Sequence, residues 1–323
     1  HITFCVNDSE IPQLVKGEVV NHFDFVPQVV KLLFGYFFLK VISRFPLSFL
    51  QLLASCIAML LYCFNASLKR ITGINLKLAY PELDDTACQA LLKKSLKSQC
   101  MTYTESIKCW GMPPEYSLNQ IKNVYGEQHL TEALANKKGV IVVVAHLGCW
   151  ELLNAWLNLH AAPMIMYKPN KHKAVDRFML EARQRLNATL VPTDETGVRA
   201  IFKHLKQGGL TVILPDHLPK ASGGIYSEFF GQKTLSTTLV SKLASKTQCN
   251  VISLSCIRNE TSGFNVYCSP LSDQILSKDL QTSVDSLNQN LEQMINITPE
   301  QYVWSYKRFR KVEAGNNIYN KTQ

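Results

Sequence analysis

The sequence lacks the residue spacings that bind metal ions or nucleic acids. Its ten cysteines include no C-x-x-C pair and are not accompanied by paired histidines, so we predict no metal site. It also has no zinc-finger spacing, no RNA-recognition motif and no block of lysines and arginines. We therefore predict no nucleic-acid partner. Several of the cysteines stand in apolar segments, where a free thiol behaves as a small hydrophobic group, which favours a reducing compartment.

Acidic residues are the scarcer charge, with 25 Asp and Glu against 34 Lys and Arg, for a formal net charge of +9. An excess of this kind favours a polyanionic partner: nucleic acid, anionic lipid or an acidic carrier protein. Charge alone does not choose among the three, although the missing motifs count against nucleic acid. With 46% hydrophobic residues among 323, we expect one large core, preceded by an N-terminal hydrophobic annex.

The annex comprises residues 29–70 and contains two apolar runs. Residues 32–39 form the first, and residues 45–64 form twenty positions without a charge, about 30 Å as a helix. A tilted membrane span, helices lying in the membrane interface and a buried helix of a soluble protein all fit, and we favour membrane attachment. No small-residue cleavage site follows, which argues against a cleaved secretory signal. We leave residues 1–28 unassigned.

Residues 71–323 read as one catalytic α/β domain, with a mixed central sheet flanked by helices. Short apolar runs alternate there with amphipathic ones, as expected for this fold class. The last helix is the clearest, because apolar residues recur from Leu280 to Met294 at intervals of three and four. The predicted strands cover residues 140–145, 164–167, 210–214, 251–257 and 264–268.

The first of these strands ends in a histidine, His146, and a glutamate, Glu151, follows five residues later. Five residues are about 500° of helical rotation, so the two cannot meet on one regular helix. We therefore expect His146 before a helix and Glu151 inside it. Glu151 would accept a hydrogen bond from one imidazole nitrogen, and the other nitrogen would take a proton from a substrate hydroxyl or amine. The alternative to such a dyad is a histidine in a turn beside an unrelated helix acid. Cys149 lies in the same segment, but the sequence does not supply the third group that a catalytic cysteine usually has.

Polar residues also follow the other predicted strands. Lys168 and Asn170 come after the second strand, and Arg183 and Arg185 end a helical stretch; these side chains are candidates to bind a phosphate or a thioester carbonyl. A solvated helix face is the alternative for the two arginines. Asp216 follows the strand of residues 210–214 as His146 follows its own strand, and it is a further candidate to bind substrate; an aspartate in an ordinary turn is the alternative. Residues 223–231, with paired glycines and phenylalanines, suit either a loop over an acyl chain or core packing.

Taken in order, these segments resemble the late acyltransferases of lipid A biosynthesis, the lauroyl and myristoyl transferases of the lysophospholipid acyltransferase-like superfamily. The resemblance implies transfer of a fatty acyl chain from acyl carrier protein to a hydroxyl of a Kdo-bearing lipid A precursor. It implies no metal, nucleotide or other cofactor, and a place on the bacterial inner membrane with the catalytic domain facing the cytoplasm. The segments that carry it are the anchor, AYPEL (79–83), AHLGCWE (145–151), YKP (167–169), VPT (191–193), GVR (197–199), LPD (214–216), FFG (229–231) and PEQYVWSYKRF (299–309).

The implied mechanism has Glu151 orient His146, which deprotonates the acceptor hydroxyl for direct attack on the thioester. Two positions depart from the family: Lys168 replaces its usual arginine and loses the two-pronged guanidinium, and His217 stands where glutamine is common. A glycerolipid acyltransferase is a weaker alternative, because its glycine-threonine-arginine motif is missing here. An acyl thioesterase, or a membrane lipid-binding protein that has lost catalysis, would also fit the sequence.

Overall fold

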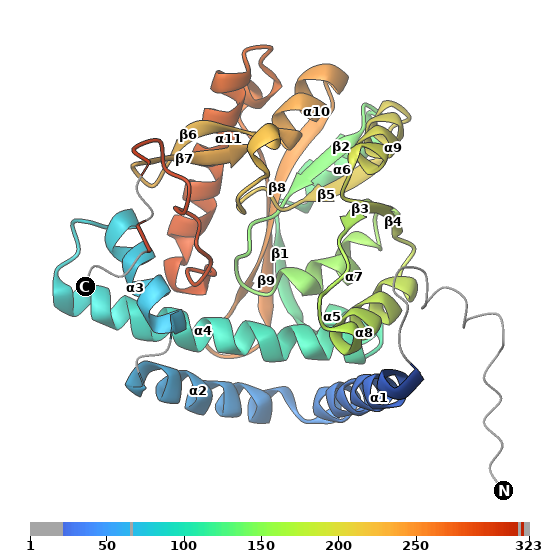
Figure 1. Cartoon of the computed structure of the whole chain (residues 1–323). Helices are drawn as coiled ribbons and strands as arrows, with labels where there is room; N and C mark the ends of the chain where they lie inside the picture. Colours follow the sequence, from blue (N-terminus) through green and yellow to red (C-terminus); the bar gives the residue numbers. More distant parts are fainter. Residues whose placement is uncertain (1–21, 65–66, 316–317, 320–323) are drawn as a thin grey trace, which may run out of the picture.

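The computed structural model describes residues 22–64, 67–315 and 318–319, with side chains from residue 32 onward. Four helices come first, and Figure 1 shows α1 and α2 lying beside α4 along one side of the domain. Residues 1–21 of the segment left unassigned lie outside the described residues. The first four helices are α1 (His22–Arg44), α2 (Leu47–Cys63), α3 (Ser67–Ala79) and α4 (Asp85–Gly111).

The central sheet has seven strands in the order β1-β9-β8-β2-β5-β3-β4. Neighbours pair in parallel except for β8 and β9, which are antiparallel, so the predicted mixed sheet is confirmed. A separate antiparallel hairpin is formed by β6 and β7. The strands are β1 (Ile121–Tyr125), β2 (Val140–Val143), β3 (Met164–Tyr167), β4 (Thr189–Pro192), β5 (Leu210–Ile213), β6 (Gly224–Phe229), β7 (Gln232–Thr237), β8 (Asn250–Arg258) and β9 (Phe264–Pro270).

Helices cover both faces of the sheet, and β2 shows why its sequence is apolar throughout. Val140 and Val142 pack into one hydrophobic cluster with α6 and α7, while Ile141 and Val143 pack into a second cluster with α9, α10 and α11. A strand buried on both faces reads as an unbroken run of branched residues. The remaining α-helices are α5 (Pro114–Gln120), α6 (Glu127–Ala135), α7 (Leu153–Leu157), α8 (Lys173–Gln184), α9 (Glu195–Lys206), α10 (Leu239–Thr247) and α11 (Leu280–Ile297).

All five predicted strands and the last helix are confirmed. The Asp279 side chain caps α11 by accepting a hydrogen bond from the Thr282 backbone N–H at 2.9 Å. The strands that the sequence did not reveal are β1, β4, β6 and β7. They stand at the two edges of the sheet or in the hairpin. All side chains of β1 and β4 are partly or fully exposed, so these two edge strands carry no long apolar run.

The predicted twenty-residue apolar run, residues 45–64, forms one helix, α2, over Leu47–Cys63, and a bend separates it from α1. Phe45 and Pro46 form the bend, because a residue before proline is driven out of the helical region; α1 therefore ends at Arg44 and α2 begins at Leu47. Buried Lys108 of α4 holds the bend, donating from Nζ to the carbonyls of Ser43 at 3.0 Å and Phe45 at 2.6 Å. Among the described helices, none alone has the length and hydropathy to cross a bilayer; residues 32–44 and α2 pass that test only as a pair bent by 115°.

Candidate active site

His146 lies on the loop that leaves the carboxyl end of β2, as expected, and the backbone around it is tightly held. Its carbonyl accepts from the Val303 N–H at 3.0 Å. Gly148 follows with φ +60°, and a Cβ there would lie 2.0 Å from the Cys256 carbonyl oxygen, so only glycine fits. The chain then enters a 3₁₀ turn, η2 (Trp150–Leu152), that carries Glu151 and leads into α7. Glu151 thus lies just ahead of the α-helix.

The imidazole of His146 is paired with Asp216. Nδ1 lies 2.8 Å from Asp216 Oδ1, and the His146 backbone N–H donates to Oδ2 at 2.9 Å. The Asp216 side chain is fully buried. Burial by itself raises the pKa of the Asp216 carboxyl, but the charge and hydrogen bonds of His146 outweigh it and hold that pKa well below its usual range. An ionised carboxylate only accepts, so Nδ1 carries the hydrogen and Nε2 is left as the basic nitrogen.

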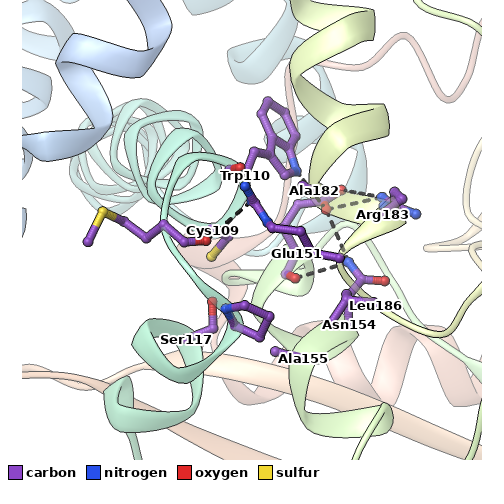
Figure 2. Close-up of a pocket in the computed structure, with 12 residues that line it drawn as sticks. Cys109, Trp110, Ser117, Glu151, Asn154, Ala155, Ala182, Arg183 and Leu186 are labelled. Atoms are coloured by element: carbon purple, nitrogen blue, oxygen red, sulfur yellow. Dashed lines mark hydrogen bonds and ion pairs between the residues drawn. The ribbon is translucent and has the colours of Figure 1, made fainter.

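Glu151 has different partners, which corrects the expected bond to His146. Figure 2 shows its carboxylate between α4 and α8. Trp110 Nε1 donates to Oε2 at 2.8 Å, Asn154 Nδ2 donates to Oε2 at 3.1 Å, and Arg183 Nη2 lies 3.1 Å from both oxygens. Within the described part of the chain, no hydrogen bond joins Glu151 to the imidazole. The Gly148 turn and the 3₁₀ turn direct the glutamate toward α8 instead.

A cavity of about 460 Å³ lies beside both residues and joins polar groups to an apolar wall. His146, Glu151 and Arg183 line it, and Lys168 also lines it while remaining exposed. The apolar wall comes from η2, α7, β3 and β5, and includes Leu153, Leu157, Ile165, Met166, Val212 and Leu214. The cavity therefore combines a base and two cations with hydrocarbon contacts.

Three of the predicted binding residues, Arg185, Asn170 and Asp216, are not among the residues that line this cavity. Arg185 donates from Nη2 to the carbonyls of Trp110 and of Met112, the latter at 3.2 Å, and lines the small pocket of Figure 2. Asn170 is exposed, and its Oδ1 accepts from the His172 backbone N–H at 2.9 Å. Both residues shape loops and helix contacts. Asp216 also has a different role from the predicted one, because it is buried against His146.

The sequence did not predict an aromatic stack beside His146. The His217 ring lies face to face with His146, with centroids 3.9 Å apart and planes inclined by 2°. Tyr306 stacks on the far side of His217 at 3.8 Å and 16°, and Trp150 meets His146 edge-on at 5.0 Å. The only sequence signal was the PEQYVWSYKRF segment, which brings Tyr306 from the far end of the chain.

Two alternative readings of the sequence are now decided. Phe229 and Phe230 are buried in the hydrophobic core around the hairpin, so core packing explains them and no loop over an acyl chain is needed. Cys149 is completely buried; its hydrogen bond with Cys109 and its burial raise the pKa of its thiol well above the usual value, which suits no nucleophile. The described residues contain no cluster of three or more metal-ligating side chains.

The chain is similar in sequence to known proteins over most of its length. Residues 21–311 match the protein family described as bacterial lipid A biosynthesis acyltransferase. The lipid A biosynthesis lauroyltransferase of Escherichia coli (strain K12) is 24% identical over 253 residues, which cover 76% of this chain and 80% of that protein. The palmitoleoyltransferase of the same organism is 23% identical over 286 residues, covering 87% and 92%. Its myristoyltransferase is 22% identical over 255 residues, covering 77% of each.

Proposed function

The chain belongs to the family of bacterial lipid A biosynthesis acyltransferases, and we propose that it moves a fatty acyl chain from acyl carrier protein to a hydroxyl of a Kdo-bearing lipid A precursor. It is thus an acyltransferase that acts in lipid A biosynthesis. The observation that carries the proposal is the pairing of His146 with buried Asp216 at the wall of a cavity of about 460 Å³ that is lined mostly by apolar side chains. A base and a hydrocarbon site in one cavity suit acyl transfer.

In the proposed mechanism, His146 Nε2 removes the proton of the acceptor hydroxyl while Asp216 stabilises the imidazolium that forms. The alkoxide oxygen attacks the thioester carbonyl, an ester C–O bond forms and the C–S bond breaks. The imidazolium then returns its proton to the departing thiolate of the carrier. No acyl-enzyme is required, which agrees with a buried Cys149.

Glu151 and Arg183 would act as a pair. The Arg183 side chain is 11% exposed and that of Glu151 is 7% exposed, so each needs the other's charge. Held by Glu151, the Arg183 guanidinium stands at the cavity and is placed to stabilise negative charge on the substrate or on the developing oxyanion. Lys168, whose side chain is exposed, adds a second cation to the lining of the cavity. In this proposal Glu151 acts through Arg183, and His146 depends on Asp216.

The membrane surface would be the bent pair α1 and α2. Large apolar side chains cover their outer side, far more than the isolated exposed residues of an ordinary soluble surface. Contact with the bacterial inner membrane would place the acceptor glycolipid near the cavity, with the catalytic domain on the cytoplasmic side, where acyl carrier protein is found. The exposed apolar residues of this surface are Leu33, Phe34, Phe37, Phe38, Val41, Phe45, Phe49, Leu52, Leu53, Ile57, Met59, Leu60 and Phe64.

The test is an assay of purified protein with radiolabelled Kdo-bearing lipid A precursor and a series of acyl carrier protein thioesters. We expect acylated lipid that depends on both substrates, and its loss in His146→Ala by about 10²-fold or more. His129→Ala is the matched control, because His129 lies at a different groove. Thioester loss without acylated lipid would identify a thioesterase, and acylation of lysophosphatidate alone would identify a glycerolipid acyltransferase. Ordinary turnover by His146→Ala would overturn the mechanism.

A further inference from the structure

The described contacts hold the His146 ring from three directions. Asp216 binds it in the ring plane through Nδ1, Trp150 meets it edge-on, and His217 covers one face with the two planes only 2° apart. A single in-plane hydrogen bond leaves the ring free to tilt about the bond axis. The flat contact with His217 blocks that tilt, and with it the swing of Nε2 away from the cavity.

His217 is itself backed and tied down. Tyr306 stacks on its other face with a centroid distance of 3.8 Å, and the Tyr306 hydroxyl accepts from the Leu218 backbone N–H at 3.0 Å. The order Tyr306, His217, His146 is therefore one continuous stack. The outer ring, Tyr306, is hydrogen-bonded to Leu218, the residue that follows His217. This bond keeps the stacked rings from sliding past one another.

The groups that face His217 keep it uncharged. Burial, the neighbouring His146 and the buried Arg308 guanidinium lower the pKa of His217 to about 4, against the opposing charge of Asp216. Near neutral pH the middle ring is therefore neutral. A neutral aromatic face does not repel the imidazolium that forms on His146 and attracts it weakly, whereas a second imidazolium at 3.9 Å would oppose proton uptake.

We propose that His217 is a positioning residue for this reaction, a flat neutral plate that sets the tilt of the His146 ring so that Nε2 stays aimed into the cavity. The inference rests on the proposed function of His146 as the base. It goes beyond that function by assigning a task to a position where this chain departs from the glutamine common in the resembling family. The ring surface of His217, and not its nitrogens, carries the task.

The test compares His217→Ala, which removes the plate, with His217→Phe, which keeps it without a titrating nitrogen. Because a misaimed base costs about 10- to 100-fold in rate, we expect His217→Ala to lose that much in kcat with KM for the acyl carrier protein thioester nearly unchanged. His217→Phe should remain within about threefold of the wild type in kcat, since an aromatic face still packs there. Tyr125→Ala is the matched control, because it removes a stack on Tyr267 far from the cavity.

Two further readouts separate positioning from a general loss of structure. Histidine-selective ¹⁵N NMR in detergent should show the His146 Nδ1–H tautomer in both His217 variants, with broadened His146 signals in His217→Ala only. The wild-type kcat/KM should fall at acid pH with the slope of one proton, because His217 stays neutral. Equal damage in the two variants, a change confined to KM, unchanged kcat in His217→Ala, or a two-proton slope would each overturn the proposal.

The NMR experiment also distinguishes this inference from the proposed function. If the wild type fails to acylate lipid but its His146 signals are sharper than those of His217→Ala, the positioning role is supported and the proposed reaction is wrong. If the wild type acylates lipid and His217→Ala matches it in kcat and in NMR line width, the reaction stands and the positioning role is wrong.

Discussion

The sharpest test of the site asks which carboxylate serves His146, and Asp216→Asn answers it. In the wild type both Asp216 oxygens accept hydrogen bonds, one from Nδ1 and one from the His146 backbone N–H. Asparagine has one oxygen, which must still accept from the backbone, so its NH₂ group faces Nδ1. The imidazole then takes the tautomer with hydrogen on Nε2, and the nitrogen aimed at the substrate can no longer accept a proton.

Loss of general-base catalysis costs about 10²- to 10⁴-fold in rate, which corresponds to about 3–5 kcal/mol of transition-state stabilisation. We expect kcat of Asp216→Asn to fall within that range, with KM for the acyl carrier protein thioester nearly unchanged. Initial rates of lipid acylation across a series of thioester concentrations give both constants. Thermal unfolding by circular dichroism shows that the variant is folded.

Glu151→Gln is the matched comparison, because it also replaces a nearly buried carboxylate by an amide. Its partners are Trp110, Asn154 and Arg183, so the His146 tautomer should be kept, while substrate binding weakens as Arg183 loses its countercharge. The reasoning is refuted if Glu151→Gln switches the tautomer in ¹⁵N NMR, or if Asp216→Asn keeps wild-type kcat.

Four further predictions follow from particular side chains. The unfolded state binds a proton on His217 below about pH 6.5 and the folded state only below about 4, so stability should fall with decreasing pH between these values by at most about 1.4 kcal/mol per pH unit; pH-dependent unfolding of His217→Phe should lack this slope. Phe34→Ser with Phe37→Ser removes two exposed phenylalanines, each worth about 1.5–3 kcal/mol when buried, and should weaken vesicle flotation at least tenfold. Leu157→Trp narrows the cavity and should shift the preferred thioester to shorter acyl chains. Lys168→Arg supplies a two-pronged donor and should lower KM for the phosphorylated acceptor.

Strands that are buried on both faces could be predicted from the sequence, because each of their side chains contacts the core. All of β2 and residues 251–257 of β8 are buried, so these residues are apolar or small without interruption. Strand β1 was not readable, since three of its five residues are exposed and its Lys122 and Asn123 break any pattern. The sequence separated the two apolar runs, residues 32–39 and 45–64, and the structure places them in two helices, α1 and α2, with Pro46 between them.

The sequence by itself determined the α/β alternation, the place of His146 at the end of a buried strand and the family to which the chain belongs. Those features are local: they follow from hydrophobic patterning and from short motifs. Only the tertiary structure decided the partners of His146. Asp216 is 70 residues away, and it arrives because β2 and β5 are parallel neighbours whose carboxyl ends meet at one edge of the sheet. Tyr306 arrives by another route, because the C-terminal segment lies against the His146 loop: Leu147 and Tyr302 form an antiparallel bridge, and the Val303 N–H donates to the His146 carbonyl. Spacing along the chain favoured Glu151, but the turns that follow His146 direct that carboxylate to Arg183, because contact in three dimensions depends on strand order and loop geometry.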